Sequence, residues 1–129
     1  MFARRFGMKI LAYRFPDLAN LANLHARGLQ MQQDPGMGTR DLWGYLHLDD
    51  AARAIALGLV APVTVMNTIN VVARDSLGGV DVARIARELF PETRIKHEIL
   101  AGLGAYDVSR AADILGFESQ IRWDDRQLP

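Results

Sequence analysis

The stretch GMKILAYRFP, residues 7–16, decides the fold class. Its centre, Met8–Arg14, is a mostly apolar run that begins after Gly7 and stops at Pro16. A run of this kind is typical of a strand buried on both faces, as in a parallel sheet. Neighbouring strands and helices must cover such a strand, so we expect the rest of the chain to supply them.

The segments that follow predict alternating helices and strands. Helical spacing of apolar residues predicts helices over 20–33, 51–61, 82–89 and 107–115. Alternating or β-branched sequence predicts strands over 45–48, 66–72 and 94–99. We expect Asp49 or Asp50 to cap the second helix and Gly116 to end the last one. The chain is therefore predicted to be α/β, with few strands for an independent doubly wound sheet.

Length and composition indicate a single domain spanning residues 1–129. Fifteen basic and fifteen acidic side chains cancel, and the basic excess typical of a nucleic-acid binder is missing. The chain has no cysteine, which excludes disulfides and thiolate metal sites. No apolar run approaches the roughly 18 residues of a membrane span. We expect neither nucleic-acid nor membrane partners, and a cytoplasmic location. The basic start of the chain leaves a transit peptide open, although the strand at 8–14 favours part of the domain.

A search for catalytic and cofactor motifs finds no complete set. Two Gly-x-Gly pairs, at 36–38 and 102–104, both lack the third glycine of the dinucleotide-binding fingerprint. None of the three tyrosines is followed four residues later by lysine, so no tyrosine–lysine acid/base pair is present. His47 near Asp49 and Asp50 could be drawn as a metal site, but the aspartates are better used as helix caps. We therefore assign neither catalytic residues nor a metal site.

Three segments carry a family resemblance. They are FGMKILAYRF (6–15), LWGYLHLDDAARA (42–54) and YDVSRAADILGF (106–117). In order and spacing they resemble the carboxy-terminal part of the NAD-dependent epimerase/dehydratase family, the extended short-chain dehydrogenases. The second segment is similar to that family's Y-[VI]-[HD]-V-x-D-x-A-x-A motif, and the third to its D-x-S-K-A-x-x-x-L-G-[WF] motif. Residues 67–72 fit the family strand between them.

The resemblance implies a partial Rossmann-like sheet followed by the small α/β substrate-binding lobe of an extended short-chain dehydrogenase. Residues 1–16 would form the last part of the dinucleotide-binding sheet. The family's cofactor-binding glycines, its catalytic Ser/Thr and its Tyr–Lys pair would lie outside this chain. NAD or NADP would therefore serve the complete family member, and we expect this chain alone to bind neither. The implied reaction is hydride transfer between a substrate carbinol carbon and nicotinamide.

The resemblance also implies site residues. Phe15 and Pro16 follow the strand that passes the nicotinamide ring, and they would line the cofactor and substrate cleft. A role in ending the strand is equally open for both, as is a structural role for the strand residues at 45 and 47. Asp107 and Ser109 match a recurring helix start and are assigned mainly to capping. The residues expected at the small-molecule substrate are Asp17, Trp43, Tyr45 and His47.

Two departures from the family bear on the substrate. Sugar-nucleotide members carry one arginine at or near the position of Trp43 and another in the loop before the last helix, where they clamp a diphosphate. Here the loop 100–105 has no charge. Arg40 and Arg94 are the remaining candidates for that role. The departures argue against a nucleotide sugar and leave a smaller or less charged substrate open.

Other functions remain open from the sequence. The chain could be a stand-alone, non-catalytic module for a small ligand or a partner, or a gene fragment without a function of its own. If it exists alone, the strand at residues 10–13 leaves unpaired sheet edges and an apolar patch. We therefore expect the isolated chain to form homo-oligomers or to be weakly stable.

Overall fold

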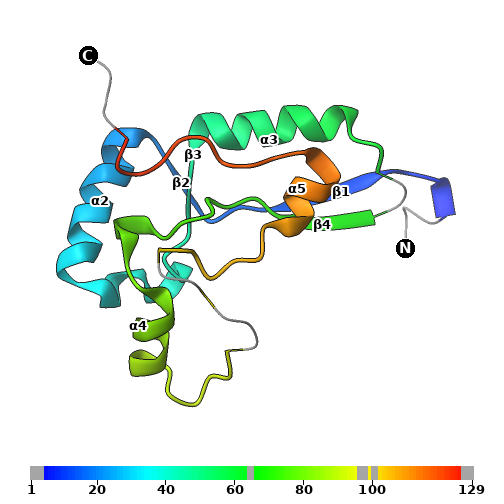
Figure 1. The fold of residues 1–129 in the computed structure, drawn as a ribbon. Helices are drawn as coiled ribbons and strands as arrows, with labels where there is room; N and C mark the ends of the chain where they lie inside the picture. The colour runs from blue at the N-terminus through cyan, green and yellow to red at the C-terminus, as the bar shows by residue number, and fades with distance from the viewer. Residues whose placement is uncertain (1–4, 64–65, 96–98, 100–101, 126–129) are drawn as a thin grey trace.

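The computed structural model describes residues 5–63, 66–95, 99 and 102–125 (Figure 1). Within these residues the chain forms two small parallel sheets of two strands each, together with several helices. The predicted α/β class is confirmed at this level, because strands and helices alternate along most of the chain.

The first sheet joins the two strands that the sequence predicted most clearly. β1 (Ile10–Arg14) runs parallel to β4 (Met66–Asn70), with Ile10 opposite Met66 and Arg14 opposite Asn70. The expectation that β1 is buried on both faces is wrong, because its residues are half-buried or exposed. Among the described residues β4 is its one strand neighbour, so the other edge of β1 is open.

The second sheet contains a strand that the sequence did not predict. β2 (Asp17–Ala19) pairs in parallel with β3 (Tyr45–His47), with Leu18 opposite Leu46. β2 has three residues and is largely exposed, so it carries no hydrophobic period that a sequence pattern could detect. It nevertheless matters for the site, because it fixes the direction of the chain directly after β1.

All four predicted helices are present. They are α2 (Leu21–Gln33), α3 (Leu48–Val60), α4 (Val82–Leu89) and α5 (Ser109–Leu115), and two 3-10 turns, η1 (Pro35–Asp41) and η2 (Leu77–Gly79), lie between them. Gly116 ends α5 with φ at 63°, as predicted. The predicted strand over 94–99 is not seen at Arg94, Ile95 or Ile99, and its residues 96–98 lie outside the described part of the chain.

The predicted cap of α3 is wrong in its residue. His47 caps this helix, because its Nδ1 accepts the N–H of Asp49 at 3.1 Å. Asp50 is instead buried, with 1% of its surface exposed, and it binds the backbone far along the chain. Asp107 does act at the start of α5, where its carboxylate accepts the N–H of Ser109 at 2.9 Å.

Two apolar clusters form the core. One lies among α2, η2 and α4 and includes Trp43, Tyr45 and Trp123. The other includes Ile69 of β4 and packs α3 and α5 against the β1–β4 pair. Figure 1 shows α3 running along this pair, with the segment after α5 returning beside α3 toward α2. This arrangement leaves the carboxyl ends of β1 and β4 pointing toward the middle of the molecule.

Candidate functional site

The three residues that follow β1 line a pocket of about 450 Å³. Phe15 and Pro16 are half-buried, and Asp17 is the first residue of β2. The remaining lining residues come from distant parts of the chain, and they are Arg40, Asp41 and Tyr106. The pocket therefore lies at the carboxyl end of β1, where ligands bind in open parallel sheets.

η1 and the turn behind it place Arg40 and Asp41 at this pocket. Leu42 and Trp43 have positive φ values of 48° and 58°, so the chain reverses there and enters β3. The hydroxyl of Tyr106 donates a hydrogen bond to the carbonyl of Asp41 at 3.3 Å, which ties the loop before α5 to this turn.

Gly44 leaves room for the ring of Tyr106. A Cβ at Gly44 would lie 2.6 Å from Cε2 of that ring, which no side chain could tolerate without a shift. Burial raises the pKa of the Tyr106 hydroxyl, and the nearby Asp41 carboxylate adds to the increase. Tyr106 therefore stays protonated and can donate a hydrogen bond throughout the physiological pH range.

The charges around the pocket are unevenly satisfied. Asp17 forms an ion pair with Arg27 of α2, so its carboxylate is compensated. Within the described part of the chain, the guanidinium of Arg40 forms neither a hydrogen bond nor an ion pair. An arginine of this kind can bind a carboxylate or a phosphate through two parallel hydrogen bonds. The pocket thus offers a small polar molecule a cationic donor at Arg40 and a carboxylate acceptor at Asp41.

The other three predicted substrate residues lie away from this pocket. Trp43 is buried, and its Nε1 donates to the carbonyl of Pro35 at 2.8 Å. Tyr45 is also buried, and its hydroxyl donates to Oδ1 of Asp75 at 2.7 Å. His47 caps α3, as described above. Of the predicted site residues, Phe15, Pro16 and Asp17 therefore lie at this pocket. Trp43 and Tyr45 lie in the core instead, and His47 lies at the start of α3.

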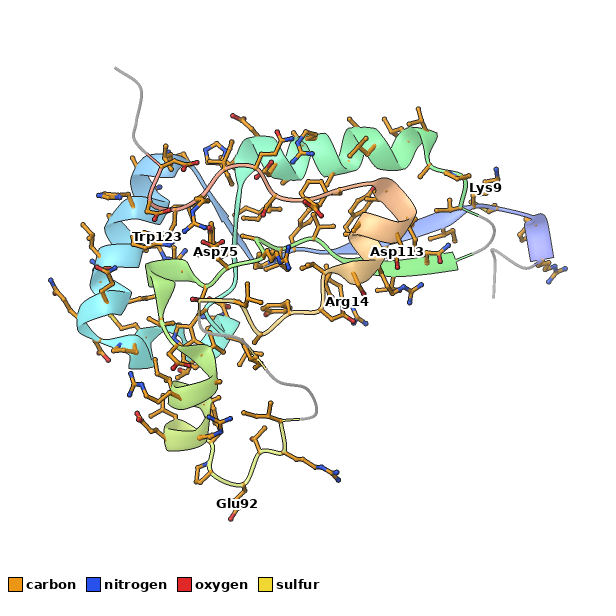
Figure 2. The ribbon with its side chains drawn as sticks, in the orientation of Figure 1. Lys9, Arg14, Asp75, Glu92, Asp113 and Trp123 are labelled. Carbon is orange, nitrogen blue, oxygen red and sulfur yellow. The ribbon has the colours of Figure 1, made fainter. Side chains whose placement is uncertain are left out.

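Tyr45 is the centre of a buried polar contact. Besides donating to Asp75, its oxygen accepts the N–H of Trp123 at 3.2 Å. Figure 2 labels these two partners, Asp75 and Trp123, in the same part of the molecule. Burial, together with the Asp75 carboxylate, raises the pKa of Tyr45 far above its ordinary value of about 10. This hydroxyl is committed to internal hydrogen bonds, and it links β3 to the end of the described chain.

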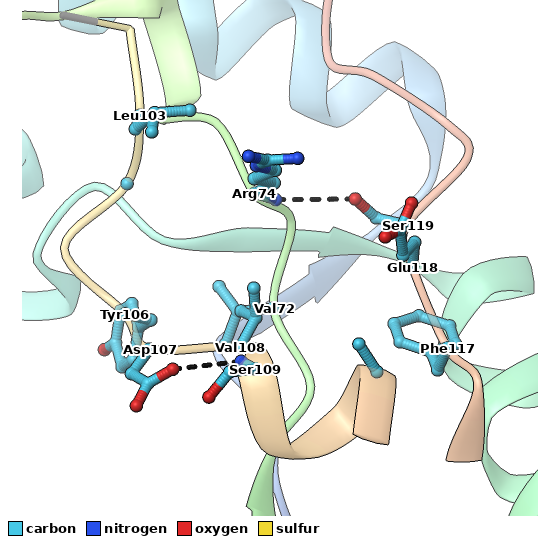
Figure 3. Close-up of a pocket in the computed structure, with 12 residues that line it drawn as sticks. Val72, Arg74, Leu103, Tyr106, Asp107, Val108, Ser109, Phe117, Glu118 and Ser119 are labelled. Atoms are coloured by element: carbon cyan, nitrogen blue, oxygen red, sulfur yellow. Dashed lines mark hydrogen bonds between the residues drawn. The ribbon is translucent and has the colours of Figure 1, made fainter. Parts of the chain in front are cut away.

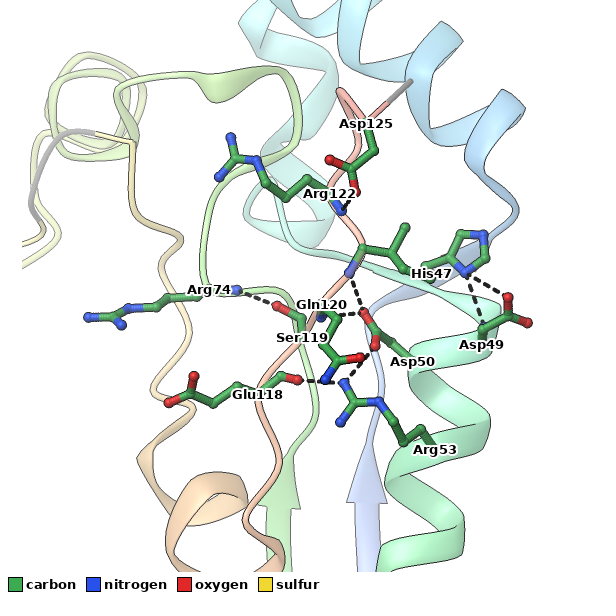
Figure 4. Close-up of polar contacts among 11 residues, drawn as sticks. His47, Asp49, Asp50, Arg53, Arg74, Glu118, Ser119, Gln120, Arg122 and Asp125 are labelled. Carbon is green, nitrogen blue, oxygen red and sulfur yellow. Dashed lines mark hydrogen bonds and ion pairs between the residues drawn. The ribbon is translucent and has the colours of Figure 1, made fainter. Parts of the chain in front are cut away.

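A second polar cluster holds the segment after α5 in place (Figure 4). Oδ2 of Asp50 accepts the backbone N–H groups of Gln120 and Ile121 at 2.8 and 2.9 Å. Oδ1 of Asp50 accepts from Arg53 at 2.7 Å, and the same Arg53 nitrogen donates to the carbonyl of Glu118 at 2.6 Å. Asp50 is therefore a clamp between α3 and residues 118–121.

The site residues that sequence reasoning missed are Asp41 and Tyr106, while Arg40 was only a candidate. Tyr106 opens the third segment of the family resemblance, but nothing in its own pattern indicates a pocket. Across the described ranges, no group of three or more His, Cys, Asp or Glu side chains could hold a metal ion. None of the helices in those ranges is long and apolar enough to cross a membrane. Comparisons of this chain with protein-family models, with curated proteins and with solved structures gave no match.

Proposed function

We propose that this chain is the carboxy-terminal substrate-binding part of an NAD(P)-dependent epimerase/dehydratase-like oxidoreductase, and that the pocket after β1 is its substrate site. The observation that carries the proposal is the convergence of Phe15, Pro16 and Asp17 with Arg40 in one pocket. The family resemblance implies a substrate cleft at the first two of these residues. The location at the carboxyl end of a parallel strand supports the same position. The proposal includes a cytoplasmic location.

Arg40 supports a particular class of substrate. The loop at residues 100–105 and the position of Trp43 lack the arginines with which sugar-nucleotide members of the family clamp a diphosphate. Arg40 nevertheless supplies one guanidinium at the pocket after β1. One guanidinium suits a single carboxylate or phosphate group. The hydroxyl of Tyr106 and the carboxylate of Asp41 can bind substrate hydroxyl groups. We therefore propose a hydroxylated small molecule with one anionic group.

We place the dinucleotide of this proposed reaction in a domain outside this chain. Gly78, which precedes α4, is packed against α2, since a Cβ there would lie 2.8 Å from the carbonyl oxygen of Gly28. This close packing supports the proposal, because a pyrophosphate group needs room beside the backbone N–H groups at the start of a helix. In this proposal Phe15 and Pro16 provide an apolar wall, and this chain's part in the reaction is to bind and orient the substrate.

A stand-alone ligand-binding module is the second candidate function. It is favoured by the way the fold of this chain brings residues 15–17 together with Arg40, Asp41 and Tyr106 from distant parts of the sequence. The two functions differ in their need for a dinucleotide-binding domain. In the first, the pocket borders a nicotinamide held by that domain. In the second, binding of the small molecule is complete without it.

A titration of the ¹⁵N-labelled chain tests the substrate site. The probes are glucose 6-phosphate, gluconate and neutral glucose. We expect amide shifts at Asp17, Arg40 and Tyr106 with the two anionic probes, and an affinity about tenfold lower or worse in Arg40→Gln, because a charge-assisted hydrogen bond is lost. Arg94→Gln is the matched control, since Arg94 is exposed and outside the pocket. Equal binding by both variants, or anionic probes that shift other residues, would overturn the proposal.

A further inference from the structure

We propose that a second pocket, at the carboxyl end of β4, binds a small zwitterion with an apolar body, such as an apolar α-amino acid. The pocket has a volume of about 380 Å³, within the range of about 300–1,000 Å³ that is usual for small-molecule sites. It is lined by residues after β4, around α5 and just beyond α5 (Figure 3). Tyr106 is the one residue that it shares with the pocket after β1. The inference goes beyond the proposed function and does not rest on it.

The floor of this second pocket is apolar and well fixed. Val72 and Phe117 are both 3% exposed, and Val108 and Ala112 are half-buried. The guanidinium of Arg53 lies 4.7 Å from the centroid of the Phe117 ring, which helps to hold that ring in place. Burial of an apolar ligand group of matching size against this floor is favourable, because the apolar surfaces of both leave water.

Three charged side chains line the same pocket, and one of them, the carboxylate of Asp107, accepts the N–H of Ser109 at 2.9 Å. Figure 3 shows Arg74 on the segment after β4 and Glu118 on the segment after α5, with Val72 and Phe117 below them in this view. Within the described residues, neither the guanidinium of Arg74 nor the carboxylate of Glu118 forms a hydrogen bond or an ion pair, with each other or with another residue. Both charges are therefore available to a ligand.

Hydrogen bonds hold the backbone at Arg74 and at Glu118. The N–H of Arg74 donates to Oγ of Ser119 at 3.4 Å, and the carbonyl of Arg74 accepts the N–H of Gly104 at 2.9 Å. The carbonyl of Glu118 accepts from Arg53 at 2.6 Å. The origins of the two side chains are therefore fixed relative to the floor, and binding needs only their outer atoms to be ordered.

This arrangement matches the charges of an amino acid. The carboxylate can accept two parallel hydrogen bonds from Arg74, and the ammonium group can donate to Glu118. The apolar side chain then lies on Val72 and Phe117. A ligand with only one charge leaves either Arg74 or Glu118 without a partner. A ligand with neither charge binds through its apolar contact with the floor alone.

Titrations of the ¹⁵N-labelled chain with L-phenylalanine, 3-phenylpropionate and phenethylamine test the inference. We expect L-phenylalanine to shift the amides of Val72, Arg74 and residues 117–119, and each analogue to bind about tenfold more weakly, because each lacks one charge-assisted contact. Arg74→Gln is expected to weaken L-phenylalanine and 3-phenylpropionate about tenfold and to leave phenethylamine unchanged. Glu118→Gln is expected to weaken L-phenylalanine and phenethylamine instead.

The control variant is Arg87→Gln. Arg87 is exposed on α4 and outside both pockets. This variant should bind L-phenylalanine as the unchanged chain does. Equal affinity for the three probes, shifts away from the second pocket, or no binding of L-phenylalanine would overturn the inference.

Discussion

Replacing Asp50 by alanine removes the clamp between α3 and the segment after α5. The carboxylate is 1% exposed and accepts the N–H groups of Gln120 and Ile121 as well as a hydrogen bond from Arg53. In Asp50→Ala the two backbone groups lose their acceptor, and the Phe117 side of the second pocket loses its support.

The structure gives the magnitude of this loss. Each hydrogen bond from a backbone N–H to a carboxylate contributes about 1.5–3 kcal/mol, and we take the lower end because Gln120 is exposed. The Arg53 side chain is 31% exposed, so its ion pair with Asp50 adds only about 0.5 kcal/mol. We therefore expect Asp50→Ala to lower the free energy of unfolding by about 3–4 kcal/mol, a large fraction of the ~5–15 kcal/mol of a typical domain.

Urea denaturation measures this change, and hydrogen exchange locates it. Asp49→Ala is the matched control, because its side chain is 84% exposed and lies 3.8 Å from His47. The free energy of unfolding of Asp49→Ala should fall by less than about 1 kcal/mol, because only a charge at the start of α3 is removed. The amide hydrogens of Gln120 and Ile121 should exchange faster in Asp50→Ala, whereas their exchange rates should be unchanged in the control. Equal stability of the two variants would refute the assignment of Asp50 as a clamp.

Three further predictions follow from the core and the open sheet. Tyr45→Phe should cost about 1–3 kcal/mol, because Oδ1 of the half-buried Asp75 loses its donor. Because burial raises the pKa of Tyr45, folded chains keep its proton above pH ~10 while unfolded chains lose it, so stability falls there as pH rises. Urea titrations across this range should show a shallower fall in Tyr45→Phe, and parallel profiles would count against the burial of this hydroxyl. Gly28→Ala should destabilise by about 1–3 kcal/mol despite a better helix former, since its Cβ meets the ring of Trp123. Unchanged thermal unfolding would contradict that contact. The isolated chain should self-associate, because β1 has an open edge and Leu59 of α3 is 84% exposed, and a sedimentation coefficient independent of concentration would contradict this.

Local patterns account for most of the elements. The apolar run at β1, the β-branched run at β4 and the strong amphipathic period of α4 each predicted the right element, because local sequence and burial agree there. β2 was missed because three largely exposed residues carry no hydrophobic period. The cap of α3 was assigned wrongly because the partners of Asp50 lie 70 and 71 residues further along the chain, where no local pattern can indicate them.

The candidate site was predictable only in part. Phe15, Pro16 and Asp17 were named from the family resemblance, which implies a cleft directly after this strand, and the end of a parallel strand is also a known place for ligands. Arg40 and Tyr106 reach the same pocket through a 3-10 turn and an irregular loop, so their convergence depends on the tertiary fold. Trp43 and Tyr45 are buried in the core and His47 caps α3, so none of the three lies at the pocket after β1.

The intact mass of the protein in its native cells tests the central claim most directly. A substrate-binding part of an NAD(P)-dependent oxidoreductase needs a dinucleotide-binding domain. We therefore predict a mass above 14.3 kDa by about another domain of ~100–200 residues. A mass of 14.3 kDa would contradict the account and would favour a stand-alone ligand-binding module.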